Sequence, residues 1–317
     1  MNTTSPLNRS KKAIAIFLIL FGIVAIGPIG CKKPAVKDVG QMTIAELQAA
    51  AEQGNSQAMV ALGLDYDTGH GLIQDFGKAA GWYRKAAQSG NSLGQFRLGF
   101  CFFVGSGVKQ DFPKAVKWFR LAANAGQLGA QAMLAEAYVK GLGVEKNYKE
   151  AFSLFQKVAM QGDSRAQCSL AACYQQGIGT ETNIAEAIAW YKRSAENGDD
   201  IAQAELGKMY LGGIGVERNP AQAFNWFQKA ALQGNPYAQM NLGFYYAFVE
   251  DTNKDLIEAC KWILIAGHQD TNVADVAFDV LKQKGIVFSS DQIAEAKHRA
   301  QEFMRTNPIS PPKYPGL

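Results

Sequence analysis

A glycine returns every 36 residues through most of this chain, and this spacing constrains the fold more than any other feature. These glycines are Gly54, Gly90, Gly126, Gly162, Gly198 and Gly234. A period of this length is typical of a solenoid, in which each repeat buries its apolar face only against its neighbours. Because the apolar positions within a repeat are three or four residues apart, we expect two helices in each repeat.

Core and cap positions recur within the repeats, counted from the leading glycine as position 0. Position 8 is leucine, position 12 is aromatic, position 25 is alanine and position 28 is tryptophan, except for Leu154 in the third repeat. We expect Trp190 and Trp226 to be buried. Position 21 is Asp or Asn, which predicts the N-cap of the second helix. Three residues further on, the last four repeats carry residues that complete a capping box: Glu150, Glu186, Gln222 and Glu258.

The leading glycine predicts a left-handed residue that ends one helix, and the Asn or Asp that follows it in most repeats predicts the N-cap of the next. The stretches Lys78–Ala87 and Ala238–Gly243 resemble the Sel-1-like repeat, a relative of the tetratricopeptide repeat. This resemblance implies an all-α fold, a right-handed α/α superhelical solenoid, and work as an adaptor or scaffold that binds a protein or peptide. One branch of the family, the Helicobacter cysteine-rich proteins, has paired cysteines in each repeat and is linked to β-lactam binding. This chain lacks that pairing.

The predicted organisation has four segments. Residues 1–31 are a signal peptide, 32–42 a linker, 43–304 the solenoid and 305–317 a proline-rich disordered tail. The solenoid is divided into a half repeat, six full repeats and two cap helices, at 43–53, 54–269 and 270–304. Capping boxes are expected where it begins and at its last helix, formed by Thr43 with Glu46 and by Ser289 with Gln292.

The first residues predict export from the cytoplasm. Basic residues precede the apolar core Ala13–Ile26, which is short for a membrane span of about 20 residues. Gly30-Cys31 resembles the end of a bacterial lipoprotein signal, which implies a lipid on Cys31. An uncleaved anchor and an ordinary cleaved signal are the alternatives. Each of them places the rest of the chain outside the cytoplasm. The lipoprotein interpretation predicts a location in the cell envelope, facing the periplasm or the cell surface.

The charge and composition of the chain give little support to other classes of function. Three of the basic residues behind the net charge of +4 lie in the leader, so no basic stripe for nucleic acid is expected. The three histidines are far apart in the sequence. On a helix Cys168 and Cys173 point about 140° apart, so we expect buried thiols and no disulfide. The other two cysteines after the leader are Cys101 and Cys260. No catalytic residue, metal or cofactor is predicted.

Two short motifs resemble catalytic ones. Gly90–Gly94 matches G-x-S-x-G, whose serine requires a preceding strand, and Ser106–Lys109 matches S-x-x-K without its partner motifs. Both stretches already fit the cap and turn pattern, so we interpret them as structural.

Apolar side chains on the outer face of two first helices predict the partner site. They are Leu93, Phe96, Phe100 and Phe103 in the second repeat, and Tyr237, Met240 and Phe244 in the sixth. Such a face indicates either a binding groove or packing against a neighbouring repeat. The sequence therefore favours a non-catalytic protein-binding scaffold of the cell envelope. The alternatives are an envelope enzyme or binder acting on peptidoglycan or β-lactams, and a purely structural envelope protein.

Overall fold

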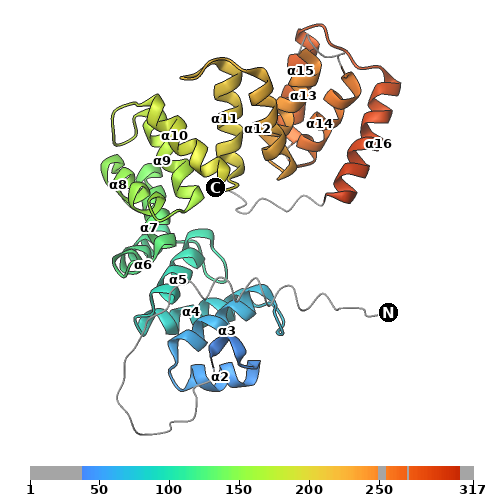
Figure 1. Cartoon of the computed structure of the whole chain (residues 1–317). Helices are drawn as coiled ribbons and strands as arrows, with labels where there is room; N and C mark the ends of the chain where they lie inside the picture. The colour runs from blue at the N-terminus through green and yellow to red at the C-terminus, as the bar shows by residue number, and fades with distance from the viewer. Residues whose placement is uncertain (1–37, 249–254, 270, 308–317) are drawn as a thin grey trace. The chain divides into compact units, whose positions relative to one another are not determined.

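A computed structural model describes residues 38–248, 255–269 and 271–307. Within these ranges the chain is helical, with a short 3₁₀ helix (Val39–Gln41), fifteen α-helices and no strand (Figure 1). The predicted signal peptide with Cys31, most of the linker, and the tail from residue 308 lie outside the described residues.

The chain divides into two compact units after Ala130, each of which is described by itself. The first unit contains α2 (Ile44–Glu52), α3 (Ser56–Thr68), α4 (Phe76–Gln88), α5 (Ser92–Val104) and α6 (Phe112–Asn124). Helix α7 (Leu128–Lys140) crosses the division. The second unit contains α8 (Tyr148–Ala159), α9 (Ser164–Gln176), α10 (Ile184–Glu196), α11 (Asp200–Gly212), α12 (Pro220–Leu232), α13 (Pro236–Phe248), α14 (Leu256–Gln269), α15 (Thr271–Gln283) and α16 (Ser290–Thr306).

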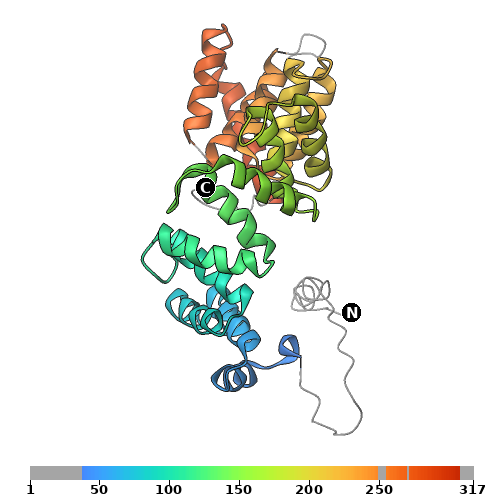
Figure 2. The same cartoon turned by 90° about the vertical axis from the view of Figure 1, so that its left-hand side faces the viewer.

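Helices pack in the order in which they follow one another. Within each unit a first helix packs against its own second helix, as α5 does on α6 and α11 on α12. A second helix also packs against the first helix that follows it, as α4 does on α5 and α12 on α13. Figure 2 shows the same helices from the side, lying next to one another within each unit. The fold is therefore the predicted all-α solenoid of helix pairs.

Helix caps occupy the predicted positions. The side chains of Asp75 and Asn183 accept hydrogen bonds from the N–H groups of Lys78 and Glu186, at 2.9 and 3.1 Å. Asn91 caps α5 in the same way, and Gly90 before it has the left-handed φ of +81° that the turn requires. The capping boxes of α2 and α16 are both present.

The reciprocal half of the capping box is absent from α8, α10 and α12, so that prediction was wrong. In these helices the backbone N–H of the N-cap residue is already used. Asn183 donates it to the carbonyl of Tyr174 at 2.8 Å, and Asn219 donates it to that of Tyr210 at 2.8 Å. No donor remains for the glutamate or glutamine, and the bond closes the turn between the two helices of the repeat instead.

The core is built from large side chains at position 29 of the repeat, which lies in the second helix. Phe227 is 1% exposed, and its ring packs on Gly207, where an added Cβ would lie 2.6 Å from the ring. Position 28 is less buried: Trp190 is buried as predicted, but Trp226 is only half-buried. The Nζ atom of Lys229 lies 4.4 Å from the centre of the Trp226 ring, so this ring faces a cation at the surface.

A glutamine at position 5 ties each of four repeats to the one before it, a feature that the sequence interpretation missed. Its side-chain amide donates to a carbonyl in the last turn of the preceding second helix, as Gln203 does to Ala195 at 3.0 Å. In the fourth and fifth repeats the oxygen of this glutamine also accepts a hydrogen bond from the residue that ends the second helix of the same repeat. Gln233 donates to Gln203 at 2.8 Å, and Asn197 donates to Gln167 at 3.2 Å.

The same position in the second repeat predicts a stabilising substitution. Gln95 Oε1 is buried without a hydrogen-bond partner among the described residues, because Ala125 stands where the donor should be. Ala125→Asn supplies that donor and should raise the free energy of unfolding by about 1 kcal/mol. Denaturant titration measures the change. Ala125→Asp, which has the same shape but no donor, is the matched control, and equal effects of the two substitutions would contradict the prediction.

Candidate functional site

The outer face of α5 carries the first group of predicted binding residues. Leu93, Phe96 and Phe100 are half-buried, and the ring centres of Phe96 and Phe100 are 6.4 Å apart. Phe96 also packs on Phe119 of α6, at 6.1 Å. This face is therefore partly packed and partly open to solvent.

Phe103 does not belong to the open face. It is 4% exposed, and its ring lies 5.3 Å from that of Phe112 and 6.0 Å from that of Phe119. It lies near the end of α5, beside Phe112 at the start of α6, so the second helix covers it. Phe103 is a core residue in this structure and is not available to a partner.

Val104 extends the apolar stripe of α5, and the sequence interpretation missed it. It is 44% exposed and follows Phe96 and Phe100 at the same four-residue step along the helix. The corresponding residues of the third and fourth repeats are Lys140 and Gln176. We call Leu93, Phe96, Phe100 and Val104 the α5 patch.

The second predicted group lies on α13, in the other unit, and is treated as a separate surface. Met240 and Phe244 pack against a buried apolar cluster that includes Ile263 of α14 and Leu281 of α15. Tyr237 is 39% exposed. The side chains of Met240 and Phe244 are therefore largely used in packing within this unit.

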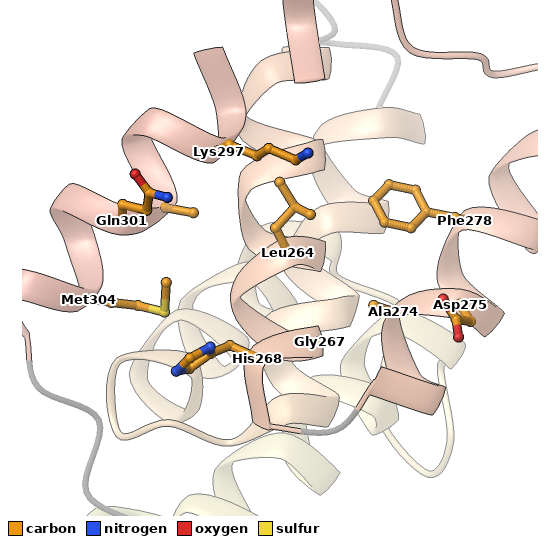
Figure 3. Close-up of a pocket in the computed structure, with 10 residues that line it drawn as sticks. Leu264, Gly267, His268, Ala274, Asp275, Phe278, Lys297, Gln301 and Met304 are labelled. Carbon is orange, nitrogen blue, oxygen red and sulfur yellow. The ribbon is translucent and has the colours of Figure 1, made fainter. Parts of the chain in front are cut away.

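A cleft of about 560 Å³ lies between α15 and α16, with α14 as its floor (Figure 3). Leu264 of α14 lies between Phe278 of α15 and Lys297 of α16, and the lysine side chain extends toward α15. Ala274, Ala300 and Met304 add to the apolar lining, while His268, Asp275 and Gln301 are its other polar residues. The sequence interpretation did not single out this cleft, because the three helices that form it belong to different parts of the repeat pattern.

The stretches that resemble catalytic motifs form caps and turns. Gly90 and Asn91 end α4 and cap α5, and Ser106 lies in the turn between α5 and α6. Cys168 and Asp199 form a thiol–carboxylate contact, but burial raises the pKa of both groups. Asp199 also caps α11 by accepting the N–H of Ala202 at 2.8 Å, which gives this carboxylate a structural role. Among the described residues, no group of three or more His, Cys, Asp or Glu side chains could hold a metal ion.

All four cysteines of the described residues are free and buried, as predicted. Burial raises the pKa of Cys101 to about 12 and that of Cys173 and Cys260 to about 11. A thiol in an unfolded chain ionises near about 8.5, and the thiolate is the reactive form. These thiols therefore remain neutral at pH 8 in the folded chain.

Two measurements test whether these thiols are buried and neutral in the folded chain. An aromatic disulfide reagent at pH 8, with peptide mass spectrometry, should label these cysteines only after unfolding. Because the folded thiols hold their protons to a higher pH than the unfolded ones, stability should fall as the pH rises from about 8.5 toward about 11. Rapid labelling of any of the four in the native chain would contradict the burial.

No helix in the described ranges is both long enough and apolar enough to span a membrane. The predicted lipid-bearing residue, Cys31, lies outside these ranges, so its modification stays a prediction.

Helix pairs that recur every 36 residues and pack in chain order define a repeat solenoid. The model of one family, described as the Sel1 repeat, matches the chain at six successive stretches. They are 56–91, 92–127, 129–163, 164–199, 200–235 and 236–270. The chain therefore belongs to the Sel1 repeat family, whose members generally mediate protein–protein interaction and whose fold is typically a non-catalytic scaffold.

Two solved structures are similar at a TM-score of 0.64 each. One is c5321, a protective antigen of uropathogenic Escherichia coli strains, which is 34% identical over 82% of this chain. This chain covers 56% of the length of that protein. The other is a Sel1 repeat protein from Oxalobacter formigenes, 32% identical over 71% of this chain and 99% of its own length. No curated protein matched the chain.

Proposed function

We propose that this chain is a non-catalytic scaffold of the bacterial cell envelope, which binds a protein or peptide through the α5 patch. The observation that carries the proposal is the exposed Val104 beside the half-buried Phe100. Other first helices carry Glu136 with Lys140, or Lys208, at the corresponding positions. A large apolar side chain that a partner buries completely contributes about 1.5–3 kcal/mol, so a few such residues make an interaction site.

Two features favour a scaffold over the alternative of an envelope enzyme or β-lactam binder. The buried cysteines hold raised pKa values, which suits inert core residues and not nucleophiles. They also lack the pairing of the cysteine-rich branch of the family. The α5 patch is apolar and partly exposed, which favours a binding protein over a purely structural one.

Substitution on the α5 patch tests the binding role. Val104→Lys places a charge in the patch without disturbing the core, because the side chain is 44% exposed. Leu121→Lys on α6 is a matched control, since Leu121 is also 44% exposed. Partners that co-purify with the tagged full chain from the cells that make it are quantified by mass spectrometry.

We expect Val104→Lys to reduce capture of a specific partner about tenfold, with little change for Leu121→Lys. Equal capture by both variants, with circular dichroism showing both folded, would contradict the proposed surface.

The location in the envelope is part of the same proposal. Its support is the leader, in which basic residues and the apolar stretch Ala13–Ile26 precede Gly30-Cys31. A lipid on Cys31 would hold the scaffold at a membrane surface while the repeats remain free to bind.

A further inference from the structure

We propose that the cleft between α15 and α16 is a docking site for an amphipathic helix of a partner protein. The partner helix would occupy the place that a second helix holds in a complete repeat. This site lies on other helices than the α5 patch, so the two proposals can fail independently.

The repeat register makes α15 a first helix without its second helix. Ala274 and Phe278 stand at positions 4 and 8, where the fifth repeat has Ala202 and Leu206. In that repeat both side chains are buried, and α11 packs on its own second helix, α12. Ala274, which is 8% exposed, and the half-buried Phe278 line the cleft, where no second helix of their own packs on them.

Helix α16 follows α15 in the chain but is held against α14. The ring of Phe303 lies 5.1 Å from that of Trp262, and Arg299 pairs with Glu258 of α14 at 3.3 Å. Ala296 and Ala300 are buried in α16. These contacts fix α16 against α14, on the far side of the cleft. Ala277 and Leu281 of α15 are buried in the core of this unit, so the side of α15 that faces the cleft is the part without a second helix beside it.

The charges of the cleft select the partner. Asp275 stands at position 5, where five of the six complete repeats carry a buried glutamine. In the fourth and fifth repeats this glutamine accepts a hydrogen bond from the residue that ends the second helix of the same repeat. A helix docked beside α15 would bring the residue at its C-terminal end close to Asp275. Because Asp275 is a carboxylate, it favours a cationic donor at that end of the partner helix. Across the cleft, Lys297 points toward α15 (Figure 3). Neither Asp275 nor Lys297 has an ion pair or side-chain hydrogen bond with the described residues.

The expected partner helix therefore has a defined pattern. An apolar stripe at i, i+3 or i+4, and i+7 would face Leu264, Phe278 and Met304. A Lys or Arg near its C-terminal end would lie by Asp275, and an Asp or Glu on its other flank would lie by Lys297. The cleft volume of about 560 Å³ is within the range of sites that bury a few side chains.

A synthetic peptide with residues 183–197 of this chain, the second helix of the fourth repeat, is the probe. Its last residue, Asn197, donates to Gln167 in the native repeat, so it is the residue expected to face Asp275. Two peptides, labelled with fluorescein, carry Asn197→Lys and Asn197→Glu. Fluorescence anisotropy measures their binding to the full chain.

We expect the Asn197→Lys peptide to bind about tenfold more tightly than the Asn197→Glu peptide. The order should reverse on protein carrying Asp275→Lys. Lys297→Glu should weaken binding, while Lys284→Glu, an exposed change outside the cleft, should not. Because these side chains are exposed, each variant is expected to fold, and circular dichroism checks it.

Three results would overturn the proposal. The first is the absence of saturable binding of either peptide, or a binding affinity that neither Asp275→Lys nor Lys297→Glu changes. The second is equal binding by a peptide with Ile188→Pro, which cannot form the helix and would indicate an extended ligand. The third is self-association of the full chain that Asp275→Lys abolishes, which would assign the cleft to a second copy.

Discussion

Phe227→Ala is expected to destabilise the packing of α11 on α12 by about 3–5 kcal/mol, the usual cost of removing a fully buried aromatic ring. Phe227 is 1% exposed and fills the space above Gly207, which has no side chain of its own to close the cavity. Every 1.4 kcal/mol is about tenfold in an equilibrium constant, so the local unfolded population should rise more than a hundredfold.

The neighbouring Trp226 provides the control. Its ring is half-buried and lies under Lys229, so Trp226→Ala should cost no more than about 1–2 kcal/mol. Because repeat arrays do not unfold in a single step, hydrogen exchange of the α11 and α12 amides is the appropriate measurement. A larger loss of protection from Trp226→Ala than from Phe227→Ala would show that the core is wrongly assigned.

Cys31→Ala is expected to move essentially all of the protein out of the membrane fraction, or to stall its processing. A lipid on Cys31 would be the attachment to the membrane, and alanine has no sulfur to carry it. Fractionation of cells after a high-salt wash, with mass spectrometry of the mature N-terminus, measures both outcomes.

Cys260→Ala is the control for this experiment, since Cys260 is a buried core thiol and its loss should not change the location. Unchanged membrane association and an unchanged N-terminus in Cys31→Ala would rule out lipidation and favour the uncleaved anchor or the cleaved signal.

The helix pairs and their ends were predictable because they depend on local chemistry. The cap at Asn183 and the left-handed glycine at Gly90 each need only a few neighbouring residues. The capping boxes of α8, α10 and α12 were not predictable in this way. The N–H group of Asn219 is used by the carbonyl of Tyr210, a bond that depends on how the turn brings two helices together.

Burial of single side chains was harder to predict than helical register. Position 13 lies on the predicted outer face, yet Phe103 is buried because Phe112 covers the end of α5. Position 28 was expected in the core, yet the Trp226 ring lies at the surface beneath a lysine. The cleft beside α15 depends on where α16 packs, and that contact joins segments distant in the sequence.

The most direct test of the scaffold role is site-specific crosslinking from the α5 patch in living cells. A photoreactive phenylalanine at the place of Val104, and a second one at the place of Leu121, sample two equally exposed sites in the same unit. A binding surface on α5 predicts that irradiation yields a discrete crosslinked species from the first site and none from the second. Absence of a crosslink at Val104, or the same products from both sites, would contradict the proposed function.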